Sequence, residues 1–185
     1  MKFIYQILAT VALMALATAL EGGVYVGPEA GGPHGHVFSD VDQVKPDQRV
    51  LQLKLNANDR VDALDLKIEL PAKHTTSLIH GGRGGYPKTL YLAKGEHIVA
   101  MEWHTGKHYG RTRVKYIKFT TDLGNSVEGG RKTGSVWTDI AKKGYQLGGF
   151  VGRSGTEIDQ IGAIWTRIAV DDVPEEDLKD EDDDK

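Results

Sequence analysis

The stretch "VLQLKLNANDRVDALDLKIEL", residues 50 to 70, alternates apolar and polar side chains over two runs. Every second residue is leucine or isoleucine, namely Leu51, Leu53 and Leu55 in the first run and Leu64, Leu66, Ile68 and Leu70 in the second. A period of two is the side-chain period of a β-strand with one buried face. The stretch therefore predicts two half-buried strands joined by the Asn- and Asp-rich segment between them.

Similar short segments recur along the chain, and most are separated by Gly, Pro, Asn or Asp clusters that are typical of turns. They are "TLYLA" (89–93), "HIVAMEW" (97–103), "VKYIKFTT" (114–121), "SVWTDI" (135–140) and "IGAIWTRIAV" (161–170). No segment after the first twenty residues keeps a period of 3.6. The pattern predicts an all-β domain of roughly ten to twelve short strands, arranged as a sandwich or a barrel.

A faint internal repeat accompanies the strands. "RVDALDLKI" (60–68) and "EIDQIGAIW" (157–165) each place an aspartate, Asp62 or Asp159, between aliphatic residues at matched offsets. Glycine pairs also recur, in "AGGPHGHVF" (30–38), "HGGRGGYPKTL" (80–90) and "VEGGRKTG" (127–134). Repeats of this kind indicate one supersecondary unit used several times. They predict pseudo-threefold symmetry among small sheets.

The first nineteen residues, "MKFIYQILATVALMALATA", have the pattern of a cleaved secretory signal. Lys2 precedes an apolar run, and Ala17-Thr18-Ala19 is a suitable cleavage site. The run is short for a membrane-spanning helix, which needs about 20 apolar residues. We therefore expect a signal peptide at 1–19, a domain at 20–170 and a secreted, extracellular protein without membrane insertion. The chain has no cysteine, so the domain is expected to depend on core packing alone.

Charge is unevenly distributed along the chain. Residues 171–185, "DDVPEEDLKDEDDDK", hold ten acids and two lysines, a net charge of −8 in a chain that carries −3 in total. Lys2 contributes +1, so residues 21–170 carry +4. The segment 171–185 contains too few apolar residues to form a core, and its composition predicts an acidic disordered tail.

The segment from Gly155 to Asp159 is a candidate ligand-binding loop of the form Gly-x-x-x-Asp. Glycine allows a positive φ and a close approach by a ligand, and a carboxylate can accept hydrogen bonds from two hydroxyl groups. The alternative is that Asp159 caps its own loop by accepting from nearby N–H groups. The turn from Gly31 to Gly35 could form a second wall of the site, or a simple linker.

Other motifs argue against several classes of function. His34-x-His36 could contact a metal ion but lacks a third ligand. The segment "HGGRGG" (80–85) lacks the Gly-Lys-Ser/Thr of a phosphate loop. We therefore predict no metal, no cofactor and no nucleic-acid partner. A glycosidase would need two carboxylates across a cleft, which the acids at Glu157 and Asp159 do not indicate, and the chain is not predicted to be an enzyme. The alternative is a protein that binds polyanions such as sulfated glycans, or an extracellular matrix protein. Either would use a basic strand face formed by Lys107, Arg111, Arg113 and Lys115.

Three segments, taken together, resemble the jacalin-related lectins, and specifically the jacalin-like lectin domain of their mannose/glucose-binding branch. They are "GHVFSD" (35–40), "HTGKHYGRTRVKYIKFTT" (104–121) and "GGFVGRSGTEIDQIGAIW" (148–165). The resemblance runs from about Gly31 to Ile168. It implies a β-prism of three four-stranded Greek-key sheets with pseudo-threefold symmetry, and sugar binding without a metal ion.

The resemblance also implies a carbohydrate-binding site with a wall at Gly35, the hairpin residues Arg111 and Thr112 at its side, and a binding loop. The loop is formed by Gly155, Thr156, Glu157, Ile158 and Asp159. On this reading Ile158 and Ile161 anchor the loop, which presents the acid Asp159, without a partner in the local sequence, to solvent. A second candidate site, with asparagine in place of the first glycine, is formed by Asn58, Asp59, Arg60, Val61, Asp62, Gly81 and Gly82. We expect a secreted lectin whose partners are mannose- or glucose-containing glycans or glycoproteins. Homo-oligomer formation remains open.

Overall fold

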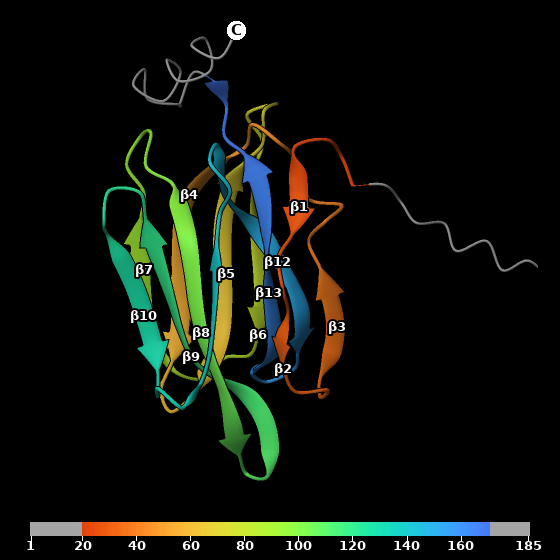
Figure 1. Ribbon diagram of the computed structural model, residues 1–185, viewed down its shortest axis with the longest axis vertical. Coiled ribbons are helices and arrows are strands. Elements are labelled where there is room, and N and C mark those ends of the chain that lie inside the picture. Colours follow the sequence, from red (N-terminus) through yellow and green to blue (C-terminus); the bar gives the residue numbers. More distant parts are fainter. Residues whose placement is uncertain (1–19, 171–185) are drawn as a thin grey trace, which may run out of the picture.

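The computed structural model describes residues 20–170, and these residues form thirteen β-strands and no α-helix (Figure 1). The strands are β1 (Val24–Val26), β2 (Ala30–Gly31), β3 (His36–Ser39), β4 (Arg49–Ala57), β5 (Val61–Glu69), β6 (Thr75–Gly81), β7 (Tyr86–Tyr91), β8 (Ile98–His108), β9 (Arg111–Thr121), β10 (Ser126–Gly130), β11 (Ser135–Ile140), β12 (Tyr145–Ser154) and β13 (Ile158–Arg167). The predicted signal peptide (1–19) and acidic tail (171–185) lie outside the described residues.

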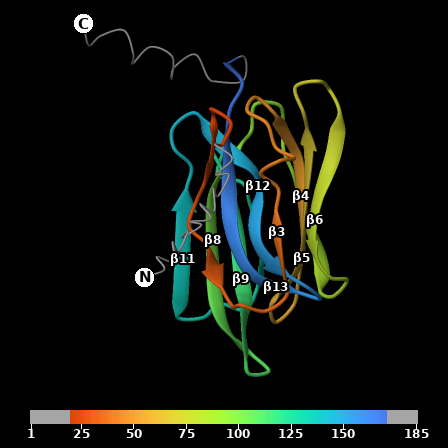
Figure 2. The same ribbon diagram turned by 90° about the vertical axis from the view of Figure 1, so that its right-hand side faces the viewer.

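The strands form three antiparallel sheets around one core (Figure 2). The strand order is β6-β5-β4-β7 in the second sheet and β10-β9-β8-β11 in the third. In each, three strands follow one another and the fourth returns beside the first, which is the Greek-key order. The terminal sheet has the order β1-β13-β12-β3, with the short β2 also paired to β13. The predicted all-β prism of three four-stranded sheets is confirmed.

The terminal sheet joins the two ends of the described chain. Its central hairpin, β12 and β13, comes from the C-terminal part, while β1, β2 and β3 come from the N-terminal part. Its β12, β13 and β3 correspond to β4, β5 and β7 of the second sheet and to β8, β9 and β11 of the third. This arrangement places the glycine-rich turn after β2 beside the loop between β12 and β13, about 120 residues further along the chain.

The opening stretch forms β4 and β5 as predicted, with one difference in β4. A bulge lies between Val50 and Gln52 in the pairing with β5. The extra residue changes which side chains face the core, so Val50 and Leu53 are buried while Leu51 is only half-buried. In β5 the predicted alternation holds from Leu64 through Leu66 to Ile68, which are all fully buried, whereas Leu70 lies beyond the strand and is half-buried.

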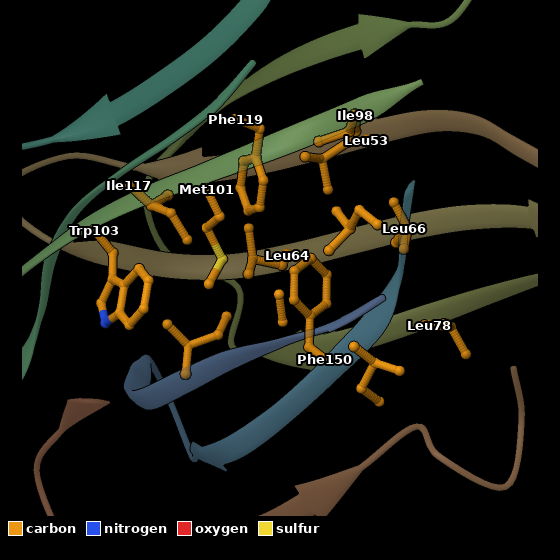
Figure 3. Close-up of a cluster of buried hydrophobic side chains, with 14 of the residues drawn as sticks. Leu53, Leu64, Leu66, Leu78, Ile98, Met101, Trp103, Ile117, Phe119 and Phe150 are labelled. Atoms are coloured by element: carbon orange, nitrogen blue, oxygen red, sulfur yellow. The ribbon is translucent and has the colours of Figure 1, made fainter. Parts of the chain in front are cut away.

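The core lies between the three sheets, where their inward-facing side chains meet (Figure 3). Phe150 of β12 packs edge-to-face against Phe119 of β9, with ring centroids 5.8 Å apart. Trp103 and Trp165 are also fully buried in this core, whereas Trp137 lies on the exposed strand β11. The core holds the strands rigidly and so fixes the loops at their ends, where the candidate site lies.

Candidate functional site

Three hairpin loops meet at one end of the prism, below the sheets in Figure 1. They join β12 to β13, β4 to β5, and β8 to β9. Just after each loop, a backbone carbonyl accepts a hydrogen bond from the glycine-rich turn of the same sheet. The three bonds are Gly32 N to Asp159 O (2.7 Å), Gly82 N to Asp62 O (2.9 Å) and Arg131 N to Lys115 O (2.7 Å). Asp159, Asp62 and Lys115 therefore occupy equivalent positions.

The loops at the first and second sites have the same backbone turn. The N–H of Gly155 donates to the carbonyl of Glu157, and the N–H of Asn58 donates to the carbonyl of Arg60, both at 3.0 Å. The first position of the loop does not use the positive φ that glycine allows, since neither Gly155 nor Asn58 has one. A Cβ at Gly155 would meet only one atom within 4 Å, the Cα of Gly35 at 3.9 Å. This open space explains why asparagine fits at position 58.

Glycine is required instead in the facing turns. Gly35 has a φ of +67° and Gly85 a φ of +74°, values that side chains other than glycine adopt only with strain. A Cβ at Gly35 would lie 2.5 Å from Oδ2 of Asp159, and a Cβ at Gly85 would lie 2.7 Å from Oδ2 of Asp62. Each aspartate thus faces a bare glycine backbone, and Gly35 lies beside Asp159, where the resemblance places a wall of the site.

Asp159 is buried and paired within the protein, which corrects the expectation that it is presented to solvent. Only 2% of the residue is exposed, and its Oδ1 contacts the Nη1 of Arg113, a β9 residue that is itself 5% exposed. Ile158 and Ile161 are fully buried and anchor the strand, as predicted. The partner that the local sequence lacks is therefore an arginine from another sheet.

This ion pair belongs to a chain of charges that links the two candidate sites. Arg113 also contacts Glu157, Glu157 contacts Arg60, and Nη2 of Arg60 lies 3.2 Å from Oδ1 of Asp62. The chain thus runs from Asp159 in the first loop to Asp62 in the second. Because Glu157 is 8% exposed and holds two arginines, its side chain serves the connection between the loops.

The third equivalent position differs in charge. Lys115, 7% exposed, stands where the other two sheets have aspartate, and its Nζ lies 3.4 Å from Nδ1 of His108. The same histidine contacts Arg60 at 3.0 Å. Desolvation lowers the pKa of both Lys115 and His108. Since a carboxylate is absent here, this end of the prism has two acidic sites and one basic position.

The charges inside this end of the prism balance. Arg60, Arg113 and Lys115 provide three positive charges, and Asp62, Glu157 and Asp159 provide three negative ones. Desolvation nonetheless raises the pKa of Asp62, and its Oδ2 is buried without a hydrogen-bond partner in the described part of the chain. An unsatisfied oxygen of this kind is available to a hydroxyl donor.

The remaining predicted residues lie around the two sites. Thr112 borders the first site, because a Cβ at Gly32 would lie 2.2 Å from the Thr112 carbonyl oxygen. The first loop in turn borders the second site, because a Cβ at Gly82 would lie 2.4 Å from the Thr156 carbonyl oxygen. The exposed residues at the rims are Arg111, Gly155 and Thr156 at the first site and Asn58 and Asp59 at the second. Gly81 continues β6 into the second turn, and Val61 is buried like Ile158.

Two contributors to the site were missed in the sequence. Arg113 was read as part of a basic surface, but it and Lys115 face inward. Arg153 of β12 donates from Nε to the carbonyl of His34 (3.0 Å) and from Nη2 to that of Gly35 (3.1 Å), which fixes the glycine wall. The signal available in the sequence was the register of the repeat: aligning Lys115 with Asp159 would have placed Arg113 beside the loops.

Within residues 20–170, no group of three or more His, Cys, Asp or Glu side chains could hold a metal ion. In the same range, no helix is long and apolar enough to cross a membrane.

The jacalin-like lectin domain family model matches residues 27–164. The chain belongs to the jacalin-like lectin family. A Plasmopara viticola protein, "Secreted RxLR effector protein 19", is 29% identical to this jacalin-like lectin over 170 residues, which are 89% of this chain and 94% of that protein. Wild-type Malaysian banana lectin is 27% identical, with a TM-score of 0.70, and the match covers 78% of this chain and 99% of that chain.

A mannose-specific jacalin-related lectin from Morus nigra, solved in complex with mannose, is 22% identical, with a TM-score of 0.68. The match covers 80% of this jacalin-like lectin and 98% of that chain, and at this identity it shows the shared fold alone. The family and its structural neighbours are carbohydrate-binding proteins and not enzymes.

Proposed function

We propose that this jacalin-like lectin is secreted and binds mannose- or glucose-type glycans, without a metal ion, at the site between the Gly35 turn and the Gly155–Asp159 loop. The observation that carries the proposal is the facing pair of Asp159 and Gly35, where Oδ2 of the aspartate lies against a backbone that has no side chain. A hexose presents adjacent hydroxyl groups, and a carboxylate oxygen fixed beside bare backbone is suited to accept from them.

The buried ion pair gives this carboxylate a fixed position. Arg113 holds Oδ1 of Asp159, so the other oxygen is directed toward the Gly35 turn before any ligand arrives. A preorganised polar group loses little conformational entropy when a ligand binds. We expect a single hexose to bind weakly at so small a site, with a Kd of order millimolar, or about −4 kcal/mol.

The second loop supports a weaker, second sugar site. Its turn matches that of the first loop at Asn58, its aspartate is backed by Gly85, and Asp62 has an unsatisfied oxygen. Two weak sites on one domain would strengthen binding to a branched glycan by multivalency. Homo-oligomer formation would act in the same way.

Neither rival function fits the side chains as well. Glu157 and Asp159 share one guanidinium, that of Arg113, so the two carboxylates are not placed across an open cleft as glycoside hydrolysis needs. The basic strand face proposed for polyanions is divided, because Arg113 and Lys115 are buried and only Lys107 and Arg111 are exposed.

A matched pair of glycine variants tests the proposed site. Gly35→Ala and Gly95→Ala both place a side chain at a positive φ, +67° and +76°, which costs each about 1–2 kcal/mol of stability. Gly35→Ala is expected to cost more, because its Cβ would also lie 2.6 Å from the backbone carbonyl of Ser154. Only the new methyl group at position 35 meets Asp159, because nothing lies within 4 Å of a Cβ at Gly95. Calorimetric titration with methyl α-mannoside and with methyl α-glucoside should therefore show binding to Gly95→Ala and none to Gly35→Ala.

Thermal unfolding of both variants checks that each is folded at the titration temperature. If Gly35→Ala binds the glycosides as the unchanged protein does, the site is not beside Asp159. Addition of EDTA should leave the affinity unchanged. A loss of binding that calcium restores would contradict metal-independent recognition.

A further inference from the structure

The rim of the first site is more cationic than a neutral sugar requires. Lys107 and Arg111 are exposed on the β8–β9 hairpin, which extends beyond the other strands at this end of the prism (Figure 1). Arg153 stands on the other side, behind the Gly35 turn. Within residues 20–170, none of these three cations forms an ion pair with a carboxylate, whereas the two arginines further inside each contact two carboxylates.

The charge balance of the interior makes this excess significant. The three cations and three acids described above cancel in net charge, so the excess positive charge around the first site comes from the three rim cations. His34 lies in the turn next to these cations and is surrounded by positive charge. Desolvation lowers the pKa of its imidazole, and the positive charges of Arg113, Arg111, Lys107 and Arg153 lower it further. A positive field around a polar site favours a ligand of negative charge.

We propose that the first site takes a mannose- or glucose-type hexose bearing a phosphate or sulfate group, with the hexose at Asp159 and the anionic group at Lys107 and Arg111. This inference rests on the proposed sugar site and names the class of ligand within it. Guanidinium and ammonium groups form charge-assisted hydrogen bonds with the oxygens of such esters. The buried acid Asp159 does not oppose the ester, because its charge is already matched by Arg113.

The inference predicts a ranking of ligands. Mannose 6-phosphate or mannose 1-phosphate should bind about five- to tenfold more tightly than mannose at low ionic strength, since exposed ion pairs contribute only modestly. The advantage should shrink as salt is added, because these charges face solvent. Mannose 6-sulfate should behave like the phosphates if charge is what is recognised. Inorganic phosphate alone should bind more weakly than either mannose phosphate.

The test is calorimetric titration of the full-length chain with these probes, repeated on the double variant Lys107→Gln/Arg111→Gln. The control is Lys94→Gln, an exposed lysine in the turn before β8, at the opposite end of that strand. The double variant should reduce the ratio of mannose-phosphate to mannose affinity to nearly one. The control should keep the ratio of the unchanged protein.

Each outcome supports or overturns the inference. If mannose and its phosphates bind equally well, the anionic class is wrong while the sugar site stands. If inorganic phosphate binds as tightly as the mannose phosphates, the rim is an anion site without sugar recognition, and the inference fails. If no probe binds at any concentration reached, the proposed sugar site itself fails.

Discussion

Replacement of Arg113 by methionine should unfold this domain at a much lower temperature, although the residue lies at a candidate binding site. Arg113 is 5% exposed and contacts Asp159 and Glu157, which are 2% and 8% exposed. Methionine keeps an unbranched apolar stem of similar length but removes the charge. Asp159 would then be a buried carboxylate without a cation.

The magnitude follows from that burial. Breaking a buried ion pair by removing one partner costs about 3–5 kcal/mol, because the remaining charge is left uncompensated. For a domain of this size each kcal/mol lowers Tm by roughly 2–4 °C, so we expect Tm to fall by about 6–20 °C. Urea unfolding at neutral pH should give the matching loss in the free energy of unfolding.

The matched control is Arg167→Met, which removes the same side chain from a solvated pair. Nη2 of Arg167 lies 2.9 Å from Oδ2 of Asp47, and the two side chains are 49% and 39% exposed. Water screens such a pair, so its loss should change Tm far less. The double variant Arg113→Met/Asp159→Asn should lose less than the sum of its single variants, because the stranded charge is removed with its partner.

Equal losses from Arg113→Met and Arg167→Met would refute the reasoning. That result would mean that water or another group compensates Asp159, and that the ion pair does not fix the carboxylate beside the Gly35 turn.

Three other predictions concern the rest of the domain. Hydrogen bonds from the Ala93 backbone and from Asn125 and Thr121 lower the pKa of Glu96. The ionised Glu96 therefore stabilises the fold above the ordinary pKa of 4.5, and this stabilisation is lost as pH falls below it. Glu96→Gln should make the decline in Tm between about pH 5 and pH 3 shallower. Phe150→Ala should lower the free energy of unfolding in urea by about 3–5 kcal/mol, because the ring is fully buried. A loss of only about 0.5 kcal/mol, as is usual for an exposed residue, would contradict the described core. Carbon-detected NMR should show that the carboxyl of Asp62 titrates above its ordinary pKa of 3.8, because desolvation raises the pKa. A titration midpoint below 3.8 would show that the charge of Arg60 outweighs desolvation.

Much of the fold could be predicted because its strands carry their period in the sequence. The alternation in β4 and β5 and the run that forms β11 were all visible. The strand β6 was missed because its Thr75-Thr76-Ser77 start is polar and largely exposed at the edge of its sheet. The parity change at Leu51 was missed because a bulge depends on pairing between strands and not on either strand alone.

The candidate site was predictable in its backbone but not in its charges. The repeat around Asp62 and Asp159 located two of the three equivalent positions. The third was hidden because Lys115 replaces the acid and because the β8–β9 hairpin is longer than the other two. The pairing of Asp159 with Arg113 joins residues 46 positions apart on different sheets, and only the folded register brings them together.

The central claim is that a mannose- or glucose-type sugar binds between the Gly35 turn and the Gly155–Asp159 loop. An NMR titration of the ¹⁵N-labelled protein with methyl α-mannoside at millimolar concentrations tests it most directly. We predict saturable shifts of the amide signals of Gly32, Gly35, Thr112 and the loop, and unchanged signals around Lys94 at the opposite end of β8. Absent shifts, or shifts confined to the opposite end, would contradict the account.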